Sequence, residues 1–397
     1  MLKVRLAVLP LLVCLAASCL VSAAFAQGGS DAQTQALVRR LQEGDRRERL
    51  TAAEEIKGRG AQAKAAVPAL AAALKDPDDD LRKVAAEALG RMGREASPAV
   101  PALTGALGDG NSSVRGNAAF ALGQVGAEAE PAVPALTGLL KDESPWARGA
   151  AARALGRIGG VAKVSVPSLT ELLKDQNEGV RRDAAEALGR FGGDARPAAP
   201  ALILLLKDGS PSARKVAAEA LGGIGPEASA AVPALKESLK DPEFVVRMNA
   251  ARALRRIGLG PGEAVPVWTG ALGDANEHVR RYAADSLAEM GPEAKAAVPT
   301  LTEALKDGDR FVRLSAAKGL GNIGGEARTA VAALAGLLKD EEPLVRAAAA
   351  TALGKLGGDA RAALPALNEL QRDQATVVRL AAAEAVNRIT SQGARAQ

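Results

Sequence analysis

The sequence of 397 residues is poor in the side chains that usually build strands, metal sites and active sites. Tryptophan, tyrosine and phenylalanine together make up 2% of the chain, although apolar residues as a whole make up 48%. Alanine and leucine must therefore form the core, which suits helices packed at close range and disfavours strands. The composition predicts an all-α protein.

Histidine and cysteine are almost absent. The single histidine is His278, and the two cysteines, Cys14 and Cys19, lie close to the N-terminus. The rest of the chain cannot supply a disulfide, a thiolate nucleophile, or a zinc or di-iron centre built on several histidines. No G-x-S-x-G or G-x-x-x-x-G-K-[ST] motif occurs. We therefore predict no catalytic residue, no metal, no cofactor and no enzymatic activity.

The chain also lacks a strong excess of charge. The net charge is +5, and it falls to about +3 when Lys3 and Arg5 of the N-terminal segment are left out. A balance so close to neutral is no signature of nucleic-acid binding. We expect no nucleic-acid partner on this ground.

The N-terminal segment has the order of a secretory signal peptide. Two basic residues precede a short apolar run, and an Ala-Phe-Ala triplet follows at 24–26. We predict a signal peptide over residues 1–26 and an exported chain, periplasmic or secreted. One alternative is a membrane anchor, for which the apolar run is short. Another is a lipobox, in which Cys19 would carry a lipid anchor. No second apolar run could serve as a membrane span.

What the sequence has in abundance is an internal repeat. The stretch 66–98 returns every 33 residues without insertion or deletion, so that Leu74 recurs as Leu107 and Leu140. A fixed period of this size is typical of stacked structural repeats, each of which must bury its apolar face on the next. The period predicts one long array in place of two or three ordinary domains.

The array has recognisable ends. The period can be followed from residue 34 to residue 390, which gives about eleven units. The first and last units are more polar than the others, as capping units should be. We predict a flexible leader at 27–33 and a frayed tail at 391–397.

Each unit reads as two short helices. The first spans 67–75, with Pro68 in its first turn, where a missing N–H costs nothing. The second begins near Asp79, after a residue that caps helices well, such as Asn111 in the next unit. It ends at Gly93, a position that is glycine in every complete unit and suits a left-handed C-cap.

These units resemble HEAT repeats, especially the short bacterial kind found in phycobilisome-lyase-like proteins. The match lies in an aliphatic first helix, a Leu-Lys-Asp at its end, and a VR-x-x-AA-x-AL-G pattern in the second helix, as in Val114-Arg115 and Ala121-Leu122-Gly123. The patterns of ankyrin and tetratricopeptide repeats are absent. The resemblance implies an α-solenoid, the HEAT/armadillo-like superhelix.

The resemblance also implies a ladder of Asp and Arg side chains between units. An aspartate after the first helix can accept N–H groups at the start of the second, and arginine offers several donors. The matching positions in the first units are Asp76, Arg82, Asp109, Arg115, Asp142, Arg148, Asp175, Arg181, Asp208 and Arg214.

A partner would meet positions that differ between units on the exposed face of the second helices. In HEAT-like arrays these helices line the concave side. Exposed aromatic and arginine side chains are typical of binding hot spots. The candidates for partner binding are Phe120, Trp146, Arg153, Arg157, Arg182, Arg190, Arg252 and Arg256. We expect three other aromatics to pack in the core or between units, namely Phe244, Trp268 and Phe311.

The sequence thus predicts a non-enzymatic, secreted or periplasmic scaffold for protein–protein interaction. The arginine-rich face favours an acidic protein or peptide as the partner, and we expect a monomer. Two alternatives stay open. The resemblance implies an enzyme or chaperone of the bilin-lyase type, and the arginine-rich concave strip would suit a solenoid that binds nucleic acid.

Overall fold

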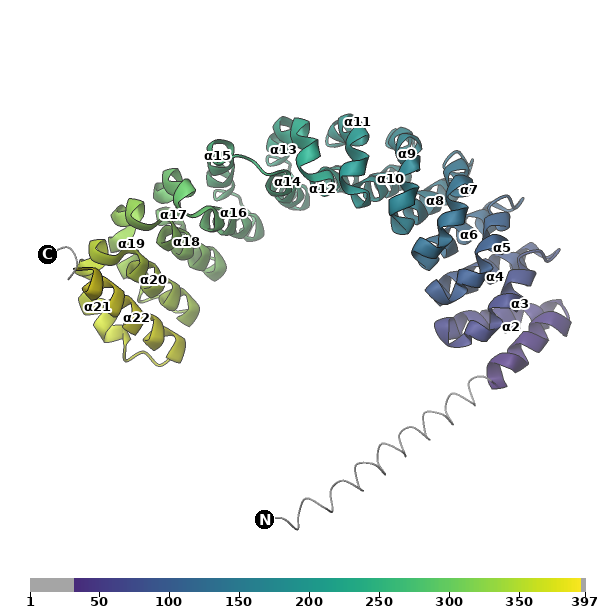
Figure 1. The fold of residues 1–397 in the computed structure, drawn as a ribbon, viewed down its shortest axis with the longest axis horizontal. Helices are drawn as coiled ribbons and strands as arrows, with labels where there is room; N and C mark the ends of the chain where they lie inside the picture. The colour runs from purple at the N-terminus through teal and green to yellow at the C-terminus, as the bar shows by residue number, and fades with distance from the viewer. Residues whose placement is uncertain (1–31, 394–397) are drawn as a thin grey trace, which may run out of the picture. The chain divides into compact units, whose positions relative to one another are not determined.

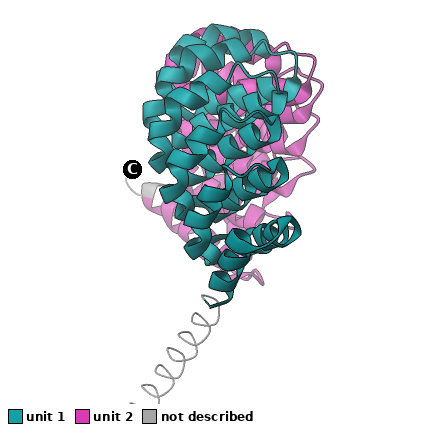
Figure 2. Cartoon of the chain, turned by 90° about the vertical axis from the view of Figure 1, so that its right-hand side faces the viewer, with its two compact units in different colours: residues 1–205 teal, residues 206–397 magenta. Residues whose placement is uncertain are grey.

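The computed structural model describes residues 32–393 of the chain. The predicted signal peptide, Cys19 and the last four residues lie outside that range. The chain divides into two compact units, residues 1–205 and 206–397, shown in different colours in Figure 2.

Both units are built from helices alone within the described residues. In the first unit, residues 32–43 are helical. They are followed by α2 (Arg46–Arg59), α3 (Val67–Ala73), α4 (Asp79–Met92), α5 (Val100–Ala106), α6 (Ser112–Val125), α7 (Val133–Leu139), α8 (Pro145–Ile158), α9 (Val166–Leu172), α10 (Glu178–Arg190) and α11 (Ala199–Leu205).

The second unit continues the alternation of short and long helices. It contains α12 (Pro211–Ile224), α13 (Val232–Ser238), α14 (Phe244–Ile257), α15 (Pro261–Ala271), α16 (Glu277–Met290), α17 (Val298–Ala304), α18 (Arg310–Ile323), α19 (Val331–Leu337), α20 (Pro343–Leu356), α21 (Leu364–Leu370) and α22 (Thr376–Gly393). The predicted all-α solenoid of about eleven helical repeats is confirmed. Helix α22 extends three residues into the segment 391–397.

Within each unit the even-numbered helices form one layer and the odd-numbered helices form the other (Figure 1). The even-numbered helices are the second helices of the repeats, and within a unit most of them pack closely against the next. Leucines of both layers, such as Leu70 and Leu89, are fully buried between them. Neither kind of helix is long enough to be stable alone, so stacking supplies the stability.

The N-caps follow from the sequence, but the C-cap conformation at Gly93 and the connections between repeats differ from it. Asp78 accepts a hydrogen bond from the backbone N–H of Asp80 at the start of α4. Gly93 ends α4 with φ of +59° and ψ of −130°, so its φ is positive but its backbone is not in the left-handed helical region that the sequence predicts. The corresponding glycines of the other repeats also have positive φ, and Gly258 has the predicted left-handed conformation. A short 3₁₀-helix, Gly93–Ala99 in this repeat, then leads into the next first helix. Its alanines Ala96 and Ala99 are buried between the layers, whereas Arg94, Glu95 and Pro98 are exposed.

Glycines let neighbouring second helices approach closely. A Cβ on Gly123 of α6 would lie 2.8 Å from the Cα of Ala154 in α8. The same relationship joins Gly321 of α18 to Ala352 of α20, also at 2.8 Å. Real Cβ atoms do not approach another atom so closely, and the spacing of packed helices depends on the side chains between them. A larger residue at these positions would force the helices apart.

None of the described helices combines the length and the apolar character needed to cross a bilayer.

Candidate functional site

In each of the two compact units, the repeated arginines bond to the repeated aspartates of the following repeat. Arg115 donates from Nε to Oδ2 of Asp142 at 2.6 Å and from Nη2 to Oδ1 at 2.8 Å. Its Nη1 donates to the carbonyl of Asp109 at 2.9 Å. Asp142 Oδ1 also accepts the backbone N–H of Ser144 at 2.8 Å. One arginine therefore joins two consecutive repeats, and one aspartate shapes the turn before the next second helix.

This Arg–Asp ladder recurs along both units. The bidentate pairs are Arg82–Asp109, Arg115–Asp142 and Arg148–Asp175 in the first unit, and Arg214–Asp241, Arg247–Asp274, Arg280–Asp307, Arg313–Asp340 and Arg346–Asp373 in the second.

The other ladder positions make the same local bonds. Arg49 pairs with Asp76. Arg181 donates to the carbonyl of Asp175 at 2.8 Å, and Asp208 accepts the N–H of Ser210 at 2.9 Å.

The aspartates of the bidentate pairs have lowered pKa values. Burial acts to raise the pKa of Asp142, but hydrogen bonds from Arg115 and from the backbone N–H of Ser144 outweigh it, and the pKa is lowered. The pKa of Asp274 is lowered for the same reasons, with Arg247 as its partner. Because both members of each pair are used internally, the ladder is structural and offers no free carboxylate or guanidinium to a ligand.

The first unit brings Trp146 and three charged side chains together. The Trp146 side chain is 44% exposed. Its indole lies over Gly116, where a Cβ would come within 2.1 Å of Nε1. The guanidinium carbon of Arg153 is 5.2 Å from the ring centroid, a cation–π contact. Glycine at 116 thus provides the space in which this aromatic side chain rests.

Asp183 anchors the arginines of this Trp146 cluster. It is 3% exposed and pairs with Arg153 and, at 3.1 Å, with Arg182. Burial raises the pKa of Asp183 in spite of both arginines. Sequence reasoning missed this residue, because nothing in the local sequence shows that position 183, a buried position of α10, carries the carboxylate that pairs with Arg153 of α8. Arg153 and Arg182 are therefore partly committed to the protein itself.

The other predicted residues of the first unit differ in their surroundings. Phe120 is half-buried, and its ring covers Gly90, where a Cβ would lie 3.0 Å from it. Arg190 pairs with Glu186 at 2.8 Å. Arg157 is exposed, and it forms no ion pair with the residues described in this structure. Of the predicted residues here, Trp146, Arg153 and Arg182 form a cluster, and Arg157 is free to meet a partner.

In the second unit Arg252 and Arg256 are exposed on α14, and neither forms an ion pair among the described residues. Arg252 lies at a cleft of about 380 Å³ between α14 and α16, which we call the α14–α16 cleft. Its lining residues are Lys215, Phe244, Val245, Met248, Asn249, Arg252, His278, Arg281, Tyr282 and Asp285.

Phe244 does not pack in the core, one of the two places predicted for it. Its side chain is 42% exposed and lines this cleft, because it is the first residue of α14, a position that is also exposed in other repeats. Trp268 is buried as expected, at 3% exposure. Phe311 is half-buried, with the guanidinium groups of Arg281 and Arg310 over its ring at 4.2 and 4.8 Å.

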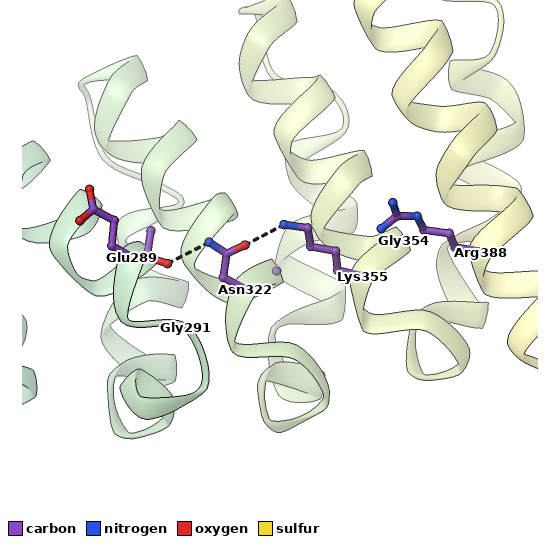
Figure 3. Close-up of a pocket in the computed structure, with 8 residues that line it drawn as sticks. Glu289, Gly291, Asn322, Gly354, Lys355 and Arg388 are labelled. Carbon is purple, nitrogen blue, oxygen red and sulfur yellow. Dashed lines mark hydrogen bonds between the residues drawn. The ribbon is translucent and has the colours of Figure 1, made fainter. Parts of the chain in front are cut away.

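A second hollow of the same layer lies over α16 to α22 (Figure 3). It has a volume of about 570 Å³, and its backbone floor includes Gly321 and Gly354, two of the close-packing glycines. Asn322 donates to the carbonyl of Ala288 at 2.8 Å, and Lys355 donates to Asn322 at 2.7 Å. These polar groups are satisfied by each other, so the hollow is a consequence of helix packing more than a prepared site.

One group of three acids among the described residues, Asp78, Asp79 and Asp80, has the spacing to hold a metal ion. Arg46 already pairs with Asp78 at 2.8 Å and with Asp80 at 2.9 Å. Asp78 also caps α4. These aspartates therefore have a structural role at the start of α4, and the group is not a candidate metal site.

Comparison with known proteins identifies the repeats. A family model described as HEAT repeats matches residues 34–112, 100–189, 198–267, 265–329 and 326–387. A model described as a PBS lyase HEAT-like repeat matches residues 180–208. No curated protein matches the sequence significantly.

Solved structures show the same fold. An engineered protein is 26% identical with a TM-score of 0.51, over 90% of this chain and 98% of that chain. Kap95p, in a complex with RanGDP, is 14% identical with a TM-score of 0.54, over 89% of this chain and 57% of that one.

A third structure is the complex of CpcE and CpcF of phycocyanin lyase from Nostoc sp., 29% identical over 59% of this chain and 92% of that chain. Its TM-score of 0.38 is too low for an argument about activity. The family models cover most of the sequence, and the ladder and paired helices recur along both units. The chain belongs to the HEAT-repeat family.

Proposed function

We propose that this protein is an exported, non-enzymatic scaffold that binds an acidic protein segment with the exposed face of its second helices. The proposal concerns the even-numbered helices of each unit and the side chains that differ between repeats. Solenoids commonly bind partners through extended surfaces of this kind.

One observation supports the proposal most strongly. Side chains that recur in every repeat are used internally, in the ladder and in the close contacts of helices. Side chains that differ between repeats on the second helices include the exposed aromatics Trp146 and Phe244, each beside arginine. Aromatic and arginine side chains contribute most of the energy at protein interfaces.

The free charges on this face favour an acidic partner. Arg157, Arg252 and Arg256 are exposed cations without an ion pair among the described residues. Complementary charge speeds association and selects partners. Binding should therefore weaken as ionic strength rises.

Capture from the periplasmic or extracellular fraction of the source cells tests the proposal. The immobilised mature protein should retain an acidic protein, identified by mass spectrometry, and the Trp146→Ala/Phe244→Ala variant should retain much less. Leu204→Ala is the matched control, since Leu204 is 69% exposed on a first helix, α11. If Leu204→Ala loses the partner while the double variant keeps it, the face is wrongly assigned.

Export needs its own measurement. Mass spectrometry of the mature protein should find Gln27 as the first residue, whereas a lipid on Cys19 would support the anchored alternative. An uncleaved chain in the cytoplasmic fraction would contradict export. An absorbance change on mixing with a bilin would count against a scaffold without chemistry.

A further inference from the structure

Helix α14 interrupts the close packing of the second helices. In α12, a Cβ on Gly222 would lie 2.9 Å from the Cα of Ala253 in α14. The position one repeat later, on the face of α14 toward α16, is Arg255 in place of glycine. An arginine cannot fit where even a methyl group would clash, so the two helices are held apart. Accordingly, α14 and α16 contact each other less closely than the other neighbouring second helices within a unit.

Large side chains fill one end of the opening. Trp268 stands where most other repeats have leucine, and its ring meets the edge of Tyr282 at 6.0 Å and 77°. Arg255 lies over Tyr282, with its guanidinium carbon 5.5 Å from the ring centroid, and pairs with Glu289. These residues hold the wider spacing, Trp268 from the buried side and the Arg255–Glu289 pair from the exposed side.

The connection between the two repeats differs as well. The chain leaves α14 at Gly258, which has φ of +83° and ψ of +67°, and enters α15 at Pro261 (Figure 1). Elsewhere a 3₁₀-helix with a buried alanine, such as Ala228, makes this connection. Pro261 replaces that alanine. Helix α15 is also longer than the other first helices, at 11 residues. The different packing and connection of this repeat are therefore encoded at several of its positions.

The spacing opens the α14–α16 cleft on the exposed face of the second helices. Phe244, Val245 and Met248 supply an apolar wall from α14, and Tyr282 faces them from α16. Phe244 is 42% exposed, although a phenylalanine gains by burial. An apolar side chain from a partner could cover it.

The rim of the cleft carries positive charge. Lys215 from α12 and Arg252 from α14 form no ion pair or hydrogen bond among the described residues. Arg281 from α16 lies 4.2 Å over the Phe311 ring and 3.9 Å from Asp285. Asp285, the one carboxylate in the lining, accepts a hydrogen bond from Ser315. His278, in the first turn of α16, is exposed. Two cations of the lining, Lys215 and Arg252, are thus left for a ligand.

We propose that the α14–α16 cleft binds an acidic peptide segment of a protein partner. One apolar or aromatic side chain of the segment packs on Phe244 and Met248, and its flanking carboxylates pair with Lys215 and Arg252. The inference rests on the scaffold function and specifies where, and by what chemistry, the second unit would hold its partner.

The test uses the mature protein with Trp146→Phe, in which Trp268 is the single tryptophan. The probe is the synthetic peptide EDDLFEDD, and the controls are KRRLFKRR, EDDSSEDD and a thymidine oligonucleotide. EDDLFEDD should bind saturably and change the Trp268 fluorescence, because Trp268 contacts Tyr282 in the lining. The three controls should bind at least about tenfold more weakly, a difference of about 1.4 kcal/mol.

Variants locate the site. Lys215→Glu and Arg252→Glu should each weaken binding about tenfold or more, and Phe244→Ala should weaken it without changing the salt dependence. Lys339→Glu is the control, because Lys339 is an exposed cation in the turn after α19, away from the second helices, and its side chain has no ion pair among the described residues. Circular dichroism and thermal denaturation verify that each variant is folded.

Two results would overturn the cleft assignment. One is an equal loss of affinity in Arg252→Glu and Lys339→Glu, which would indicate non-specific charge attraction. The other is tighter binding of the oligonucleotide than of EDDLFEDD. If partner capture depends on Trp146 but not on Lys215, Phe244 or Arg252, the cleft proposal fails and the scaffold function stands. If no protein is captured by the second-helix face, the scaffold function itself fails.

Discussion

Arg247 joins its repeat to the next by donating Nε to Oδ2 of Asp274 at 2.6 Å and Nη2 to Oδ1 at 2.7 Å, across 27 residues of sequence. Side-chain exposure is 13% for the arginine and 9% for the aspartate. A bidentate pair so well shielded from water is much stronger than an exposed one.

Asp274→Ala should therefore lower the free energy of unfolding by about 3 kcal/mol, since it leaves Arg247 and the N–H of Asn276 without their acceptor. Urea denaturation followed by circular dichroism measures the change. Glu237→Ala is the control, because Glu237 pairs with Lys240 at side-chain exposures of 73% and 74%. That loss should stay below about 0.5 kcal/mol. Equal losses in the two variants would contradict a structural ladder.

The ladder also predicts a dependence of stability on pH. Burial opposes ionisation of Asp274 and Asp307, but their arginine and backbone partners lower both pKa values below the unfolded value of about 3.9. A lowered pKa in the folded state stabilises the protein fully above the unfolded pKa, and this contribution is lost as the pH falls through the folded pKa. Many ladder aspartates act together. The melting temperature, measured at constant ionic strength, should fall steeply below about pH 4. A melting temperature that rises on acidification would contradict this.

The close-packing glycines should tolerate no side chain. Gly321→Ala places a Cβ 2.8 Å from the Cα of Ala352 and should destabilise the protein by about 1–3 kcal/mol. Gly336→Ala is the matched control in α19, where a Cβ meets nothing within 4 Å. Because alanine is the better helix former, that variant should be neutral or more stable by up to about 1 kcal/mol. Chemical denaturation of the Gly321→Ala and Gly336→Ala variants measures both changes in the free energy of unfolding. An undiminished stability of Gly321→Ala would show that the helices can move apart without cost.

Charge reversal should have very different effects on stability at Arg153 and Arg157, the two neighbouring arginines of α8. Arg153→Glu puts a carboxylate beside the buried Asp183 and should cost about 3 kcal/mol of stability or more. Arg157→Glu changes an exposed, unpaired residue and should alter stability by less than about 0.5 kcal/mol. Thermal denaturation of both variants checks this. Equal melting temperatures would mean that Asp183 does not depend on Arg153.

The repeat period was sufficient to predict the two helices of each unit, because proline and glycine mark their ends in nearly every copy. The 3₁₀-helix Gly93–Ala99 was not predicted, since its short alanine-containing sequence has no period long enough to identify a helix. The partnership of Arg153 with Asp183 depends on which helix faces turn toward each other, and a single repeat does not contain that information.

The exposure of Phe244 was predictable from its own column of the repeat, because the equivalent residues Pro145, Glu178 and Pro211 are also exposed. The wider spacing of α14 and α16 depends instead on Arg255, where every earlier complete repeat has glycine. The change from glycine to arginine is visible in the sequence, but its effect on the spacing of α14 and α16 follows only once the packing of glycine against the next helix is known. Irregular repeats in an array are thus as informative as the regular ones.

The most direct test is hydrogen–deuterium exchange of the mature protein with and without the captured partner. Binding through the second helices predicts slower exchange in α14 (Phe244–Ile257) and α16 (Glu277–Met290), with little change in α13 and α15. Protection confined to the first helices α13 and α15 would contradict the account.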